Sequence, residues 1–281
     1  MRILKRGITA LAAVMALCVA VPTVAMACQA PAAAAVGDSF ISGEGGLETG
    51  PYLAGSDTPT DQCHRSASGP AVLAAAIAKL NLRVNATCSA ATTQNLLTTG
   101  QYGELPQVQQ LDHRLKYVFV SIGGNDVGFG TLVGCFLQAD CDQTTTPQQT
   151  LQAIDQLGPK LDAAYRAIRW AAPHATVVVN LYPSLLPTVQ SGPTGFCPKI
   201  NAGEVMLGNQ IQDKLNATIA AHAMRHGFKV ADVSAQARRH NICTNVSWFY
   251  QPGTVPPAAT LHPTALGRAA LAGADVVALQ Q

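Results

Sequence analysis

The stretch Ala33-Ala34-Ala35-Val36-Gly37-Asp38-Ser39-Phe40 runs from small apolar residues directly into a polar turn. Residues 33–37 predict a short buried strand, and the glycines on both sides of Ser39 predict a tight turn from that strand into a helix. Such a turn exposes the Ser39 hydroxyl and directs backbone N–H groups into the same cleft. An N-cap serine beside an Asx-type turn at Asp38 is the alternative interpretation.

Similar apolar runs and longer helical patterns alternate along the rest of the chain. Short runs that predict further strands lie at 82–87, 117–122, 176–181 and 228–233. Apolar residues at helical spacing predict helices at 70–80, 147–171, 201–226 and 263–279. Strand–helix alternation with nearly continuous apolar strands predicts an α/β fold with a central parallel sheet covered on both faces.

Ligands of such sheets bind beyond the carboxyl ends of the strands. Ser39, Ala90 and Asn125 each follow a predicted strand, so we expect all three at one rim. Asn125 lies in Gly-Gly-Asn-Asp, where its amide could donate to a developing oxyanion, a contact worth about 3 kcal/mol of barrier. Asp126 is expected to anchor this turn.

A serine hydroxyl becomes an effective nucleophile only when a base takes its proton. His262, whose backbone is restricted by the proline after it, is the first candidate for that base, and His64 is its rival. A chain that brings Ser39 and His262 together beside an amide donor can attack an ester.

Residues 1–27 predict a signal peptide. Arg2, Lys5 and Arg6 precede an apolar run, and Ala25-Met26-Ala27 fits the small-x-small pattern before a cleavage site. The apolar run, residues 8–21, is short for a membrane span of about 20 residues. A retained N-terminal anchor and a lipoprotein attached through Cys28 remain alternatives. Residues 28–34 are expected to be a short spacer and residues 35–281 one domain.

Only 12% of the 281 residues are charged and the net charge is +2. No basic stripe is present, so nucleic acid is not an expected partner. Cys18 is removed with the signal peptide, and Cys28 lies at the cleavage site. The cysteines that follow are even in number, which in an exported chain indicates disulfides. The set is Cys63, Cys88, Cys135, Cys141, Cys197 and Cys243. The simplest pairing is consecutive, although the sequence leaves others open. No Cys-x-x-Cys pair is present, so we expect no metal.

Three ordered blocks carry a resemblance to a known family: Gly37-Asp38-Ser39-Phe40, Gly123-Gly124-Asn125-Asp126 and Leu261-His262-Pro263. Together they resemble the SGNH (GDSL) hydrolases, most closely the secreted, three-disulfide esterase and lipase branch of actinobacteria. The resemblance implies a flavodoxin-like three-layer α/β/α sandwich, Ser39 as nucleophile and His262 as general base. It implies an oxyanion hole built from Ser39, Ala90 and Asn125, and no cofactor.

Two positions depart from the family pattern. Ala90 stands where the family has glycine, so its backbone N–H can serve only if its backbone angles suit a residue with a Cβ. Ala259 stands where the family often has an aspartate three residues before the histidine. We therefore hypothesise a Ser39–His262 dyad whose imidazole is oriented by a backbone carbonyl, that of Ala259.

The sequence thus predicts a secreted serine esterase or lipase that acts on acyl-lipid or simple esters, as a monomer without a stable membrane span after signal cleavage. A carbohydrate acetylesterase is the first alternative. A catalytically inactive binding module of the cell envelope is the second, and the missing acid is the feature that favours it. The segment Trp248-Phe249-Tyr250 is a candidate apolar wall of the site.

Overall fold

The computed structural model describes residues 29–138, 140–188, 197 and 200–281. Within this part of the chain, parallel strands form one sheet in the order β2-β1-β3-β4-β5, which is the flavodoxin-like order. The strands are β1 (Ala32–Gly37), β2 (Asn81–Asn85), β3 (Tyr117–Ser121), β4 (Thr176–Asn180) and β5 (Lys229–Ala231). The predicted fold class is confirmed. The predicted signal peptide and Cys28 lie outside the described residues.

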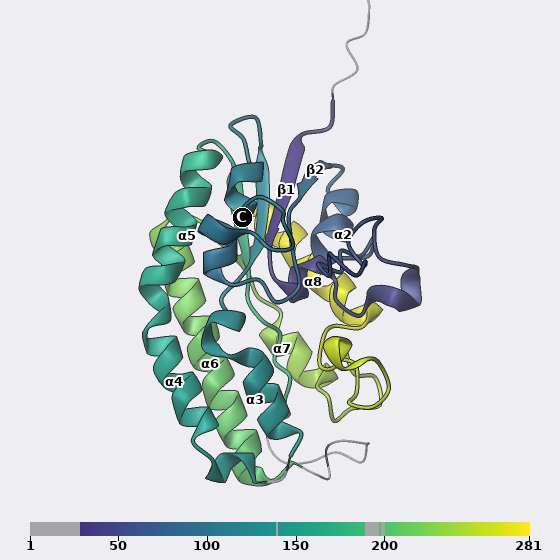
Figure 1. Cartoon of the computed structure of the whole chain (residues 1–281), viewed down its shortest axis with the longest axis vertical. Coiled ribbons are helices and arrows are strands. Elements are labelled where there is room, and N and C mark those ends of the chain that lie inside the picture. Colours follow the sequence, from purple (N-terminus) through teal and green to yellow (C-terminus); the bar gives the residue numbers. More distant parts are fainter. Residues whose placement is uncertain (1–28, 139, 189–196, 198–199) are drawn as a thin grey trace, which may run out of the picture.

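Helices cover both faces of the sheet (Figure 1). On one side α2 (Pro70–Ile77) packs against α8 (Ala265–Gln280), and on the other α5 (Leu157–Ala171) packs against α6 (Ala202–Arg225). The other α-helices of the described residues are α1 (Ser39–Ser42), α3 (Phe129–Phe136), α4 (Thr146–Asp155) and α7 (Ser234–Ala237). None of the helices in the described ranges is long and apolar enough to cross a bilayer.

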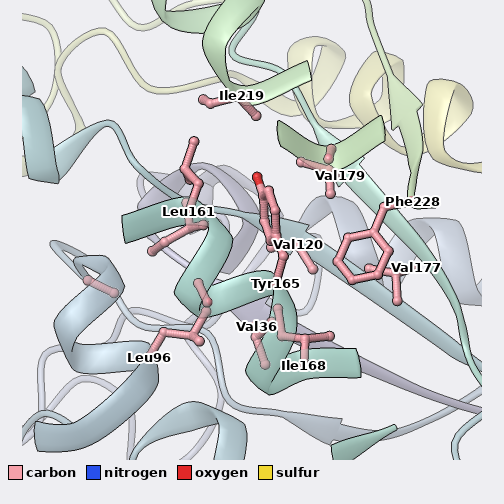
Figure 2. Close-up of a cluster of buried hydrophobic side chains, with 14 of the residues drawn as sticks. Val36, Leu96, Val120, Leu161, Tyr165, Ile168, Val177, Val179, Ile219 and Phe228 are labelled. Carbon is pink, nitrogen blue, oxygen red and sulfur yellow. The ribbon is translucent and has the colours of Figure 1, made fainter. Parts of the chain in front are cut away.

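Alternation along the strands divides the core into two layers, because successive side chains point to opposite faces of a sheet. Val36, Val120 and Val179 pack with residues of α5 and α6, among them Tyr165 and Ile219 (Figure 2). The neighbouring strand positions face α2 and α8, and these are Ala33, Ala35, Phe119 and Val178. Both layers are buried, so the sheet is a rigid support for the loops at its carboxyl edge.

The structure corrects two of the boundaries expected from sequence. The strand β1 begins at Ala32, so the last residues of the expected spacer 28–34 belong to the sheet. The single helix expected at 147–171 is two helices, α4 and α5, separated at Gln156. The reason is Pro159, which has no N–H and whose ring would clash with the carbonyl of Asp155 if one helix continued through it.

The consecutive pairing of the cysteines is confirmed. The disulfides join Cys63 to Cys88, Cys135 to Cys141 and Cys197 to Cys243. The first matters most for the rim, because it fixes the loop after β1 to the end of β2, two residues before Ala90.

Candidate active site

Ser39 is the first residue of α1, directly beyond the carboxyl end of β1. Asp38 caps the helix, since its Oδ1 accepts the N–H of Phe40 at 3.0 Å. Gly37 has φ 131°, and a Cβ at this position would collide with the backbone of Ser121 on β3. Only glycine therefore allows the strand to end and turn here.

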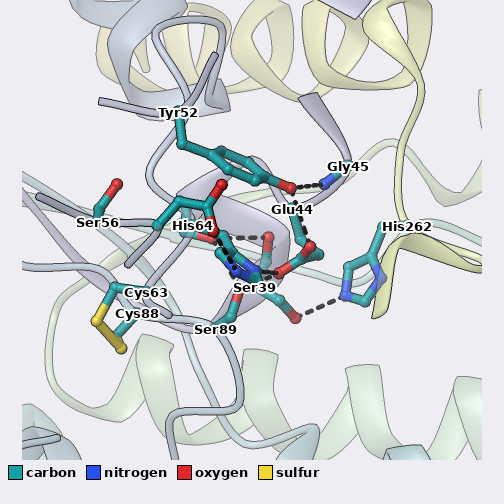
Figure 3. A network of polar contacts seen from close by, with 12 residues as sticks. Ser39, Glu44, Gly45, Tyr52, Ser56, Cys63, His64, Cys88, Ser89 and His262 are labelled. Carbon is teal, nitrogen blue, oxygen red and sulfur yellow. Dashed lines mark hydrogen bonds and ion pairs between the residues drawn. A yellow bond between two sulfur atoms is a disulfide. The ribbon is translucent and has the colours of Figure 1, made fainter. Parts of the chain in front are cut away.

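His262 approaches Ser39 from the far end of the chain. Its Nε2 lies 2.7 Å from Ser39 Oγ, across 223 positions of sequence (Figure 3). The rings of Phe40 and Phe129 pack beside the imidazole, with centroids 5.1 and 6.5 Å away. Both members of the pair are largely buried, with relative exposures of 7% for Ser39 and 8% for His262. The structure thus brings together the nucleophile and base expected from sequence.

Burial lowers the pKa of His262, although the charge of Glu44 and the carbonyls of Thr260, Ala258 and Ala259 raise it in part. A lowered pKa keeps the imidazole neutral near pH 7, so Nε2 can accept a proton. The carbonyl of Ala259 accepts the backbone N–H of His262 at 3.0 Å. The ring Nδ1 is buried, and no hydrogen bond of good geometry reaches it among the described residues, although the carbonyls of residues 258–260 lie close enough to raise the pKa of the ring.

The rival base has a different partner. His64 Nδ1 lies 2.7 Å from Glu44 Oε2, and its ring stacks on Tyr52 with a centroid distance of 4.7 Å. No contact joins His64 to Ser39 among the described residues. His262 is therefore the base that the geometry favours.

Ala90 and Asn125 follow β2 and β3, the two strands that flank β1 in the sheet. Ala90 has φ 62°, the left-handed conformation in which glycine is usual. No described residue accepts the N–H of Ala90 or of Ser39, and Ala90 is exposed. The Asn125 amide donates to the carbonyl of Ala91 at 2.9 Å and keeps a second N–H. Each of these turns therefore keeps an N–H without an acceptor among the described residues.

The Asn125 turn is held by polar contacts on both sides. Asp126 accepts the backbone N–H of Thr93 at 2.9 Å and its hydroxyl at 2.6 Å, which is the anchoring expected of it. Gly124 donates its N–H to the hydroxyl of Tyr182 at 2.8 Å, and that hydroxyl donates to Asp38. Burial raises the pKa of Asp38 to about 7.

Sequence reasoning missed several of the residues that support the site. Gln107 hydrogen-bonds both the N–H and the carbonyl of Gly37, at 2.6 and 3.0 Å. The sequence analysis also did not identify Tyr182, which hydrogen-bonds Asp38, or Glu44, which hydrogen-bonds Ser89. Nothing in the local sequence of Gln107 or Tyr182 indicates such a role. Glu44 carried a weak signal, because it is an acidic residue five positions after the nucleophile.

An apolar cavity of about 70 Å³ opens at the same rim, within a wider cleft whose empty space of about 800 Å³ includes open solvent. Three of its lining residues are the chain neighbours of site residues: Phe40 beside Ser39, Gly124 beside Asn125 and Leu261 beside His262. The cavity continues between α3 and α6, where Phe136 and Gly208 line it. The wall expected from Trp248-Phe249-Tyr250 does not line the cavity. Phe249 instead packs in a core cluster together with the lining residues Leu186 and Leu261.

One group of possible metal ligands occurs in the described ranges, formed by Asp61, Cys63 and Glu104. The sulfur of Cys63 is bonded to Cys88, so it is not free to coordinate an ion.

Comparison with known proteins agrees with this geometry. Residues 35–270 match the model of the GDSL-like lipase/acylhydrolase family. Lipase 1 of Streptomyces coelicolor is 33% identical over 244 residues, which cover 85% of this chain and 84% of the relative.

Two solved structures are similar over nearly their whole length. The extracellular lipase of Streptomyces rimosus superposes with a TM-score of 0.73 at 29% identity, over 89% of this chain and 99% of that one. Phospholipase A1 of Streptomyces albidoflavus superposes with a TM-score of 0.72 at 28% identity, over 89% and 98%. The chain belongs to the GDSL-like lipase/acylhydrolase family and is a carboxylic ester hydrolase.

Proposed function

We propose that this hydrolase cleaves esters of long acyl chains through an acyl-enzyme on Ser39, with His262 as general base. Ser39 Oγ attacks the ester carbonyl while His262 Nε2 takes its proton. His262 then gives that proton to the leaving alcohol. Water, activated by the same imidazole, attacks the acyl-enzyme and releases the acid. The distance of 2.7 Å between Oγ and Nε2 supports this assignment.

The negative oxygen of the tetrahedral intermediate is held, in this proposal, by the N–H groups of Ser39 and Ala90 and by the Asn125 amide. Three donors arranged before the reaction stabilise the charge without reorganising as it forms. Neither backbone N–H has an acceptor among the described residues, which supports this role.

The observation that carries the choice of substrate is the apolar cavity. Its lining is almost entirely aliphatic and aromatic, and its polar groups are the side chains of Thr150 and Gln212 and the hydroxyl of Tyr182. Burial of an acyl chain there is favourable by about 0.8 kcal/mol per methylene. A sugar hydroxyl group would find few partners in such a cavity, which weighs against the carbohydrate acetylesterase alternative.

The test is hydrolysis of p-nitrophenyl esters from acetate to palmitate by the purified, oxidised protein and its Ser39→Ala variant. We expect kcat/KM to rise with chain length and to be lost in the variant. A maximum at acetate would contradict the acyl-chain assignment, and full activity of Ser39→Ala would contradict the nucleophile.

We also propose that the protein is exported as a monomer after cleavage of residues 1–27. The leader pattern and the similarity to an extracellular lipase support export. N-terminal sequencing of the protein recovered from a culture supernatant tests the cleavage, and light scattering tests the oligomeric state.

A further inference from the structure

Glu44 is a buried carboxylate without a lysine or arginine partner among the described residues. Its relative exposure is 3%. Three side chains donate to it instead: Tyr52 at 3.0 Å, His64 at 2.7 Å and Ser89 at 2.5 Å (Figure 3). Burying a carboxylate is costly unless hydrogen bonds replace its water. This set of donors therefore holds the side chain in one position.

The contacts of Glu44 join two turns of the active site. Its backbone N–H donates to the carbonyl of Ser39 at 3.1 Å, so it belongs to the nucleophile turn. Its side chain binds Ser89, the residue before Ala90. Ser42 adds to the same junction, with its hydroxyl 3.3 Å from the Ser39 carbonyl and 3.4 Å from the Ser89 hydroxyl.

Ala90 needs such a support. A residue with a Cβ in the left-handed conformation costs roughly 1–2 kcal/mol, and it keeps that conformation only where its surroundings determine it. Here the surroundings are the bond from Ser89 to Glu44, the disulfide at Cys88 and the bond from Gln101 to the Ser89 carbonyl at 2.9 Å.

We propose that Glu44 is a positioning residue of the hydrolase, which through Ser89 fixes the Ala90 N–H relative to Ser39 so that both donors meet one oxyanion. This inference rests on the proposed function. Glu44 touches no reacting atom. Its loss would displace a donor, and an error of about 1 Å in such a site can cost about 100-fold in rate.

The charge of Glu44 provides a second, independent readout. Glu44 raises the pKa of His262, whereas no carboxylate occupies position 259. The titratable groups that face Glu44 are Tyr52 and His64, and Asp57 lies 3.6 Å from the far nitrogen of His64. Removing the charge at position 44 should therefore move the acid limb of kcat/KM to lower pH, because that limb reports the free-enzyme pKa of the base.

The experiment compares Glu44→Gln, Glu44→Asp and Ser89→Ala with the parent enzyme, each with a measured Tm. We expect Glu44→Gln and Ser89→Ala to lower kcat by about 10- to 100-fold with KM within about twofold. Affinity for a trifluoromethyl ketone, which forms a tetrahedral oxyanion adduct with the serine, should fall by the same factor. The acid limb should shift down in Glu44→Gln alone, since Glu44→Asp and Ser89→Ala keep the charge.

Glu104→Gln is the matched control. Glu104 pairs with Arg65 near the same loops but contacts neither turn, so kcat should stay within about twofold. The proposal would be overturned if Ser89→Ala and Glu44→Gln had the same kcat as this control. It would also be overturned if the two variants changed only KM, or if their affinity for the ketone were unchanged. If Glu44→Gln does not fold, Ser89→Ala alone decides, because it removes one hydroxyl. A parent enzyme inactive on every ester would instead contradict the proposed function.

Discussion

Replacement of Gly208 by leucine tests the acyl cavity most directly. Gly208 lies on α6 and lines the cavity at a distance from Ser39, opposite Leu186 and Phe136. A Cβ at this position would collide with the end of the Leu186 side chain and lie 3.4 Å from the Phe136 ring. A leucine would therefore fill the inner part of the cavity and leave its mouth open.

The expected loss follows from the volume that the new side chain occupies. Leucine adds about four carbons, so it excludes about four methylenes of a bound chain, at about 0.8 kcal/mol each. The total, about 3 kcal/mol, corresponds to a fall of roughly 200-fold in kcat/KM for palmitate. Acetate does not reach this depth, so its kcat/KM should change by less than about twofold.

The assay is the ratio of kcat/KM for palmitate to that for acetate, which cancels errors in the active fraction of each preparation. Gly273→Leu on α8 is the control, because a Cβ there meets no atom within 4 Å and α8 covers the other face of the sheet. An unchanged ratio in a folded Gly208→Leu enzyme would show that the acyl chain binds elsewhere. An equal change in Gly273→Leu would show that the effect is not local.

Four further predictions concern the rim. Asn125→Ala should lower kcat by about 100- to 1,000-fold in ester assays with KM little changed, because one oxyanion donor is lost; a loss below about fivefold would exclude that role. Ala90→Gly should raise the free energy of unfolding in urea by about 0.5–1 kcal/mol, since relief of the left-handed strain exceeds the added entropy of the unfolded chain; a destabilised variant would contradict it. The raised pKa of Asp38 means that the folded state holds a proton that the unfolded state releases above about pH 4. Stability should therefore fall as pH rises from about 4 to 7, and Asp38→Asn should flatten that slope in Tm, whereas an unchanged slope would place the titration elsewhere. Ala259→Asp should raise kcat/KM, by up to about tenfold, because it offers the buried Nδ1–H of His262 an acceptor; a loss of activity would indicate that the carbonyls of residues 258–260 already orient the ring.

The parts of the fold that sequence predicts are those set by local pattern. The apolar runs at 33–37, 117–122 and 176–181 became the buried strands β1, β3 and β4, because a central parallel strand must be apolar on both faces. The edge strands β2 and β5 are more exposed and carry polar residues. The prediction of one helix at 147–171 was wrong, although the sequence contains the residue that divides it. Pro159 interrupts a helix even where the apolar residues keep a helical spacing on both sides of it. The start of α6 carries a further local signal that the sequence analysis did not use, since Asn201 and Glu204 form a complete capping box there.

For the site too, the residues predicted from sequence are those that lie in a local pattern. Ser39, Asn125 and His262 were found because each lies in a short motif with its own backbone requirement. Gln107 and Tyr182 were not, because their contacts with Gly37 and Asp38 span 70 and 144 positions and leave no local pattern. The apolar wall was misplaced for a related reason. An aromatic run shows that a segment buries surface, but it does not show against which part of the molecule.

Three buried carboxylates connect the three turns that carry the expected oxyanion donors. Asp38 reaches the Asn125 turn through Tyr182 and Gly124, Glu44 reaches the Ala90 turn through Ser89, and Asp126 reaches the same loop through Thr93. Each of these carboxyl groups has its hydrogen-bond partners only when both of its turns are in place, because a buried polar group without a hydrogen bond is costly. A displacement of any of these turns would break hydrogen bonds to a buried carboxyl group and so raise the free energy of the folded state. This account explains how a site with a strained Ala90 and no acid beside His262 can keep its geometry: the acidic residues of the rim hold the backbone rather than the base.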